Sequence, residues 1–130
     1  MVTLSAAVKE HIERCIAGLD GPGYAIDEEA RSHGAIALMG AIGAIWALRP
    51  DGTFWQFDAD FELALSPLPK EQETIALAYG ARRHSWLSEA LPNRPAVATT
   101  CQSCQGRASF PATVGEVMCP SCSGLGWVVA

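Results

Sequence analysis

Four cysteines near the C-terminal end are the residues whose types and spacing most clearly predict chemistry. They form two Cys-x-x-Cys pairs separated by fourteen residues, Cys101 with Cys104 and Cys119 with Cys122. A short turn can aim both sulfurs of a pair at one point, and four thiolates are the ligand set of a closed tetrahedral zinc site. Such a site leaves no open coordination position for water. We therefore predict one structural Zn²⁺ held by these four cysteines.

The cysteines have two alternative chemistries. A Cys-x-x-Cys pair can be a redox dithiol, and five cysteines in a chain of 130 residues can build a disulfide framework. Two regular pairs with one odd residue, Cys15, instead favour metal binding in a reducing compartment. The N-terminal sequence also lacks the basic start and continuous apolar core of a signal peptide. We therefore expect a cytoplasmic protein.

Glycines follow each cysteine pair in a repeated pattern. Residues 119–127 read Cys-Pro-Ser-Cys-Ser-Gly-Leu-Gly-Trp, which resembles one Cys-x-x-Cys-x-Gly-x-Gly repeat of the cysteine-rich zinc domain of DnaJ-type co-chaperones. The first pair is followed by Gly106 but then by Arg107 and Ala108, so it lacks the second glycine. The resemblance covers residues 101–126 and two repeats where the full domain has four. Because the chain also has no J-domain His-Pro-Asp signature, the resemblance implies a single DnaJ-like zinc ribbon used as a module.

The elements that must position this ribbon begin with an N-terminal helix. Apolar residues recur at three- and four-residue steps through residues 3–17, which predicts an amphipathic helix with Thr3 as its N-cap and Gly18 at its end. Cys15 lies on the apolar stripe of this helix. We expect it to be a buried small hydrophobic residue, because nothing near it in the sequence would lower its pKa.

A β-meander and a second helix are predicted to follow. The apolar runs 35–39 and 41–48 and the aromatic stretch 53–57 predict three antiparallel strands, with a hairpin between Ile45 and Phe57. Prolines and acidic residues then favour the start of a helix over about residues 70–90. Together these elements predict an α+β fold with a body over residues 1–95 and a zinc ribbon over residues 96–130.

The charge distribution bears on the class of partner. The formal net charge is −5, and residues 1–62 hold ten acidic against four basic residues. Nucleic-acid binding depends on clustered Lys and Arg, so we predict no nucleic-acid partner. An acidic body favours a basic protein surface instead. The candidate partner-binding residues are the acidic side chains and one apolar residue of the tail, namely Asp27, Glu28, Glu29, Asp58, Asp60 and Trp127.

Catalytic motifs are missing from the chain. There is no phosphate-binding glycine loop, no Gly-x-Ser-x-Gly and no His-Glu-x-x-His. The enzymatic alternative is a metal-dependent hydrolase that uses His33 with Asp58, Asp60 or Glu62, since these three carboxylates could also accept Mg²⁺ or Ca²⁺. Residues 32–48 are uncharged but short and interrupted by three glycines, so we predict no membrane-spanning helix.

These observations favour a non-enzymatic zinc-binding protein that acts through another protein. A compact, acidic and non-catalytic chain suits an immunity- or antitoxin-like protein that covers a basic toxin surface. A chaperone-like module that holds clients through the ribbon and Trp127 is the alternative from a different class, and it predicts an apolar groove beside the zinc.

Overall fold

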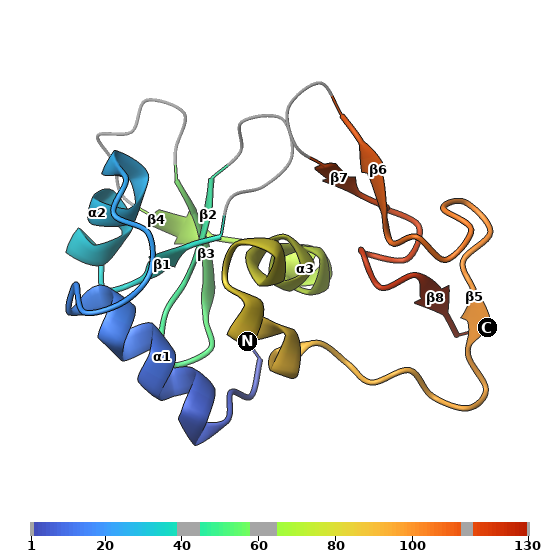
Figure 1. The fold of residues 1–130 in the computed structure, drawn as a ribbon, viewed down its shortest axis with the longest axis horizontal. Coiled ribbons are helices and arrows are strands. Elements are labelled where there is room, and N and C mark those ends of the chain that lie inside the picture. Colours follow the sequence, from blue (N-terminus) through green and yellow to red (C-terminus); the bar gives the residue numbers. More distant parts are fainter. Residues whose placement is uncertain (1, 39–44, 58–64, 113–115, 130) are drawn as a thin grey trace.

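A computed structural model describes residues 2–38, 45–57, 65–112 and 116–129. The fold is α+β: helices pack against an antiparallel sheet, and a four-cysteine ribbon follows at the C-terminal end (Figure 1). The elements in chain order are α1 (Ala6–Ile16), α2 (Ala25–Ser32), β1 (Ile36–Ala37), β2 (Trp46–Leu48), β3 (Phe54–Phe57), β4 (Leu65–Pro67), η2 (Lys70–Gln72), α3 (Glu73–Arg83), η3 (Ser85–Ala90), β5 (Thr99–Thr100), β6 (Ser109–Pro111), β7 (Glu116–Met118) and β8 (Trp127–Val128).

The N-terminal helix is shorter than the sequence predicted. Its N-cap is Ser5, whose hydroxyl accepts a hydrogen bond from the amide of Val8 at 3.2 Å, so the prediction of Thr3 as the cap was wrong. The helix ends as expected before Gly18, which has a positive φ of 77°. Its apolar face, including Cys15, is buried, which confirms the expected role of that residue.

The acidic residues after the first helix form a second helix, α2. Asp27 explains why the helix begins there, because its carboxylate accepts a hydrogen bond from the amide of Tyr24, the N-cap residue, at 3.1 Å. Acidic residues in the first turn also complement the positive end of the helix dipole.

The predicted meander is confirmed and gains a fourth strand. β1, β2, β3 and β4 pair in sequential order and all antiparallel, with Leu48 opposite both Ile36 and Phe54. The amide of Phe57 donates to the carbonyl of Ile45 at 3.0 Å, which closes the predicted hairpin. Strand β4 includes Pro67, and at the sheet edge a proline without an N–H costs no ladder hydrogen bond.

The second predicted helix is interrupted. Helix α3 ends at Arg83, and His84 adopts an extended conformation before the 3₁₀-helix η3 begins. The ring nitrogen Nε2 of His84 lies 3.1 Å from the carbonyl oxygen of Ala37, and the side chain is buried. This tertiary contact accounts for the break, which helical periodicity alone did not predict.

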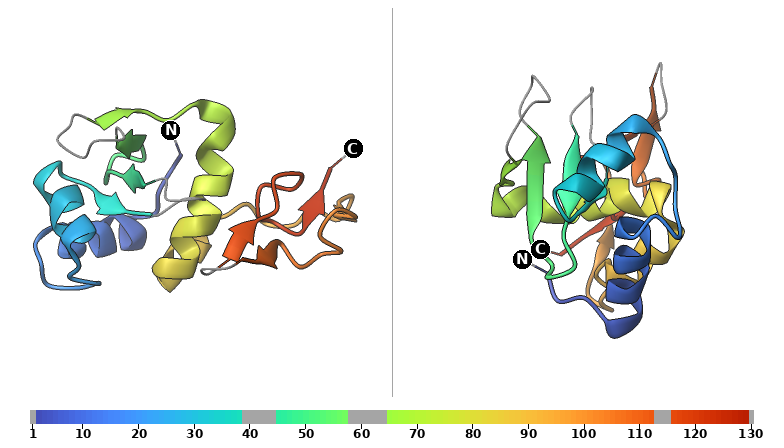
Figure 2. Two further views of the ribbon diagram at one scale, coloured as in Figure 1. Left: turned by 90° about the horizontal axis from the view of Figure 1, so that it is seen from above. Right: turned by 90° about the vertical axis from the view of Figure 1, so that its left-hand side faces the viewer.

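The hydrophobic core lies between the sheet and the helices. Leu38, Leu48 and Leu87 are fully buried there with Val8 and Ile12 of α1. Seen from above, α3 stands between the four-stranded sheet and the ribbon, so its two sides face different parts of the molecule (Figure 2). Over the described residues no helix is long and apolar enough to cross a bilayer.

Candidate metal centre

The two cysteine pairs form matched turns. In the first, the amides of Gly106 and Arg107 donate to the carbonyl oxygens of Cys101 and Cys104, both at 3.1 Å. In the second, the amides of Gly124 and Leu125 donate to the carbonyl oxygens of Cys119 and Cys122, at 3.0 and 3.1 Å. Each turn therefore fixes its own pair of sulfurs through the same two backbone hydrogen bonds.

Left-handed backbone conformations explain the glycine pattern. The residue after each pair and the glycine that follows have positive φ, which are 54° and 80° at Gln105 and Gly106 in the first turn. The final glycine of the second turn, Gly126, has φ 85°. Its counterpart is Ala108, which lacks the expected glycine yet adopts φ 68°. The first turn thus keeps the geometry of the repeat, although the β-carbon of Ala108 makes this conformation sterically unfavourable.

The two turns are joined by a pair of equivalent backbone hydrogen bonds, one from each turn to the other. The amide of Cys101 donates to the carbonyl of Gly126 at 3.0 Å, and the amide of Cys119 donates to the carbonyl of Ala108 at 2.8 Å. Strand β5 before the first pair accordingly pairs with β8, and β6 pairs with β7. The hairpin of β6 and β7 thus lies between the two cysteine pairs, and the C-terminal tail forms strand β8.

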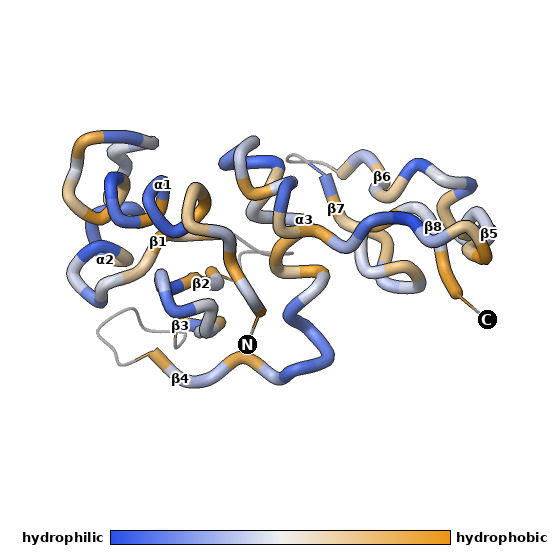
Figure 3. Tube along the Cα trace, turned by 90° about the horizontal axis from the view of Figure 1, so that it is seen from below, coloured by the Kyte–Doolittle hydropathy of each residue, from blue (hydrophilic) through white to orange (hydrophobic). Residues whose placement is uncertain are grey.

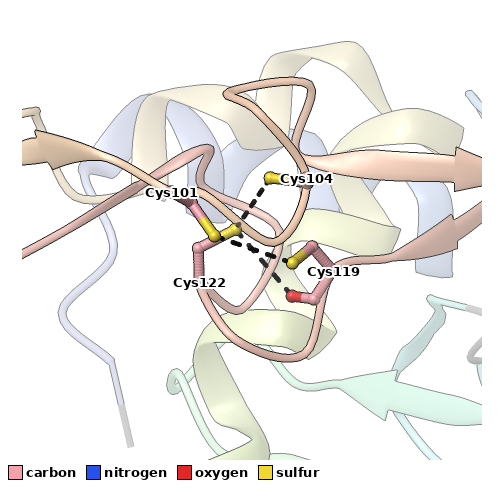
Figure 4. Close-up of side chains that lie close together, drawn as sticks. All are labelled: Cys101, Cys104, Cys119 and Cys122. Carbon is pink, nitrogen blue, oxygen red and sulfur yellow. Dashed lines mark hydrogen bonds between the residues drawn. The ribbon is translucent and has the colours of Figure 1, made fainter.

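The four sulfurs converge on one point (Figure 4). All lie within 4.8 Å of one another, with 3.9 Å between Cys101 and Cys119 and 3.7 Å between Cys104 and Cys122. Sulfurs that bind one zinc tetrahedrally at about 2.3 Å are about 3.8 Å apart, so the spacing fits this ion. All four side chains are buried. The cluster can therefore hold a metal ion, and zinc is the ion that its ligands and geometry suit.

Hydrogen bonds and burial set the acidity of two of the thiols in opposite directions. Burial alone would raise the pKa of Cys104, but the backbone amides and neighbouring sulfurs around it outweigh that effect and lower its pKa to about 7. Burial raises the pKa of Cys122 to about 11. Zinc requires thiolates, so its binding at this cluster must release protons and must weaken as the pH falls.

Helix α3 holds the second turn against the body. The hydroxyl of Tyr79 accepts a hydrogen bond from the buried amide of Met118 at 2.9 Å. A side-chain carbon at Gly124 would lie 2.6 Å from the β-carbon of Ala78, so only glycine permits this approach. Arg82 adds an exposed ion pair with Glu116 at 3.6 Å. The ribbon is thus fixed to the body at the residues next to its metal ligands.

The predicted acidic partner-binding residues lie in different environments. Asp27 is buried and forms a two-pronged ion pair with Arg83, one bond of which is 2.9 Å. Burial alone would raise the pKa of Asp27, but the hydrogen bonds and charge of Arg83 hold it below its usual value. The Asp27 carboxylate therefore forms an ion pair inside the body. Glu28, in contrast, is exposed, and Glu29 is half exposed.

The remaining predicted residues do not gather at a second site in the described part of the chain. His33 lies 3.5 Å from Glu29 and edge-on to Phe57. Its proposed hydrolase partners Asp58, Asp60 and Glu62 lie outside the described residues. Trp127 is half buried in strand β8. Among the residues that the structure places, the four cysteines are the one group of three or more potential metal ligands that come together.

Sequence reasoning missed the residues that connect the cluster to the body. Tyr79 and Ala78 lie on α3 and form a buried cluster with Met118, and no sequence signal shows that this side of the helix meets the ribbon. Two places were open for Arg83, a solvated face or a contact with the acidic N-terminal half, and it binds Asp27 across fifty-six residues of chain. The second glycine repeat was the available clue to a close approach at Gly124.

Comparisons with protein-family models, with curated proteins and with solved structures found no match. The likeness to a DnaJ-type repeat therefore rests on residues 101–126 alone, and the geometry supports a zinc-ribbon-like site without assigning a family.

Proposed function

We propose that this protein is a non-enzymatic zinc-binding protein that acts by binding another protein. The observation that carries the proposal is the buried four-sulfur cluster. Four thiolates fill a tetrahedral coordination sphere, so the ion they hold has a structural role and activates no water. The zinc then serves to hold the ribbon in a fixed shape on helix α3.

Charge and exposed apolar side chains support the protein-binding role. The net charge of −5 disfavours anionic partners, and large apolar side chains are exposed at Leu19, Tyr24, Val97, Phe110 and Val129. Apolar contacts supply affinity in protein interfaces, while complementary charge speeds association with a basic partner. The sharper form of the proposal is an immunity- or antitoxin-like protein that binds and neutralises a toxin.

The chaperone-like alternative receives less support from the groove beside the zinc site. The groove at the first cysteine pair is lined by Thr99, Thr100, Cys101, Gln102 and Gln105, so no large apolar side chain lines it. A client-binding groove for unfolded chains should be apolar instead. The tail itself is partly exposed: Trp127 is half buried in β8, Val129 after it is exposed, and the hydrophobic end of the chain lies beside the C label in Figure 3.

Affinity capture tests the protein-binding role. Tagged, zinc-loaded protein is incubated with extract of its native host, and captured proteins are eluted with untagged protein and identified by mass spectrometry. The proposal predicts one basic protein at a constant ratio to the bait. For the sharper form, that protein arrests growth when expressed alone and no longer does so when co-expressed with this chain. Recovery of nothing beyond a tag-only control would contradict the protein-binding role.

A further inference from the structure

A groove with mainly apolar walls runs along the N-terminal end of helix α2. Its lining consists of Tyr24, Ala25, Ile26 and Glu29 from the helix region and Ile45 from the entry to strand β2. Tyr24 is 70% exposed, and Leu19 in the preceding connection is 67% exposed. Among the described residues of the body, these are the exposed large hydrophobic side chains. The groove therefore offers apolar surface that the described part of the chain leaves to solvent.

The charges on α2 are divided between its two sides. Asp27 and Ala30 face the interior, and Arg31 lines a small cavity on that side with Cys15. Glu29 lines the groove, and Glu28 is exposed next to it. Arg83 binds Asp27 and Arg14 binds Asp20, while Glu29 lies 3.5 Å from His33 at the other end of the helix. The groove side of α2 is thus apolar with a negative rim.

We propose that this groove binds a basic amphipathic segment of another protein. One large apolar side chain of that segment fills the space between Tyr24, Ile26 and Ile45, and Lys or Arg residues beside it meet Glu28 and Glu29. Exposed ion pairs contribute little affinity, so the apolar anchor holds the segment while the acidic rim selects positive partners over anionic surfaces. The inference rests on the proposed protein-binding function and assigns it a surface and a partner chemistry.

A synthetic peptide tests this assignment without knowledge of the natural partner. The probe is a helical peptide with leucine on one face and lysine on the other, titrated into the full zinc-loaded chain and followed by amide NMR. The largest shifts are expected at Tyr24, Ile26, Glu29 and Ile45. A peptide of the same pattern with glutamate in place of lysine should not bind.

Paired variants separate the groove from general electrostatic attraction. Glu28→Lys with Glu29→Lys should weaken peptide binding about tenfold at low salt, in keeping with the loss and reversal of two nearby charges. Glu10→Lys with Glu13→Lys makes the same change in net charge on exposed positions of α1 and should weaken it far less. Tyr24→Ser keeps a good N-cap residue but removes the ring, and its matched control is Val97→Ser in the linker.

The outcomes decide between this surface and others. Equal weakening by both charge pairs, shifts confined to the ribbon, or no binding of the lysine peptide would each overturn the groove assignment. The affinity-capture result tests the protein-binding role separately. A captured partner whose binding is unchanged by Glu28→Lys would therefore contradict the groove assignment and leave the protein-binding role standing. A dimer of the protein alone that Tyr24→Ser abolishes would show that a second copy occupies the groove instead.

Discussion

At the scale of single residues, the ribbon depends on left-handed backbone positions. Three of these positions in each turn have positive φ, and both turns place a non-glycine residue directly after the second cysteine, Gln105 in one and Ser123 in the other. The turns differ at their final position, where one has Ala108 and the other Gly126. This difference gives a direct test of why the repeat contains its second glycine.

We expect the substitutions Ala108→Gly and Gly126→Ala to have opposite effects on stability. Ala108→Gly relieves an unfavourable φ and should raise the free energy of unfolding of the zinc-loaded protein by up to about 1 kcal/mol. The gain is reduced because glycine also increases the conformational entropy of the unfolded chain. Gly126→Ala should destabilise it by roughly 2 kcal/mol or more, since its new carbon would lie 2.8 Å from the carbonyl oxygen of Gly106. Chemical denaturation measures both. A stabilising Gly126→Ala would contradict this explanation.

His84 should make the stability of the body depend on pH. Burial lowers its pKa below 6.5, and the positive charge of Arg83 acts in the same direction, while its bond to Ala37 and the charge of Asp27 oppose them. Above about pH 6.5 the histidine is neutral in both folded and unfolded chains, so this stability is fully present. As the pH falls below that value, the unfolded chain gains protons first and stability is lost by at most about 1.4 kcal/mol per pH unit.

The free energy of unfolding, measured by urea titration between pH 7 and pH 5, checks this expectation. The substitution His84→Gln should lower stability at pH 7 but flatten the decline with falling pH. An equally steep decline in the variant would assign the pH dependence to other groups.

At the scale of elements, the decisive contact is between α3 and the second cysteine turn. The helix covers this turn through Ala78 and Tyr79, whereas the first turn has Thr100 and Gly126 as the nearest neighbours of its glycine. The pseudo-symmetry of the ribbon is therefore broken by the body. Two equivalent glycines, Gly106 and Gly124, experience nearly the same φ but different surroundings.

Alanine at these two glycines separates backbone strain from docking. Both substitutions impose strain at a positive φ of 80° or 77°, but only Gly124→Ala forces the ribbon away from Ala78. We expect Gly124→Ala to cost about 1–2 kcal/mol more than Gly106→Ala. Tyr79→Phe, which removes the hydroxyl bound to Met118, should cost about 1 kcal/mol on its own. Equal losses for the two glycine variants would argue that α3 does not restrain the ribbon.

Much of the element pattern follows from the sequence, and the exceptions have tertiary causes. Periodicity and turn residues predict α1 and the hairpin of β2 and β3. The break at His84 depends on a bond to Ala37, and the capping of α2 depends on Asp27, which Arg83 also binds. Cysteine spacing predicts the metal cluster, because its ligands are local pairs. The surface on which the cluster docks involves α3, which no local pattern connects to it.

At the scale of the whole molecule, the ribbon and the body differ in what stabilises each. The body has its own apolar core, while the buried cluster of the ribbon consists of the four cysteines with Val128 packed against it. A unit of this size depends on its metal, whose binding contributes on the order of 10–16 kcal/mol in small zinc peptides. The boundary between body and ribbon, predicted near residue 95, can be tested on this basis.

Chelation should therefore unfold the ribbon and leave the body folded. We expect most helical circular dichroism to remain, because the helices belong to the body. Amide exchange should rise over residues 99–112 and 116–129, whose fold depends on the metal. Added zinc should reverse this rise. Loss of all structure in one transition on chelation would contradict a body that folds on its own.

The central claim is that the four cysteines hold one structural zinc, and metal analysis of the purified protein tests it most directly. We expect about one zinc per chain, and loss of that zinc with increased amide exchange over residues 99–112 and 116–129 in Cys104→Ser or Cys122→Ser. Cys15→Ser is the matched control and should retain the metal, because Cys15 lies in the core of the body. A wild-type protein purified under reducing conditions that takes up no zinc, or one whose zinc survives both substitutions, would contradict the claim.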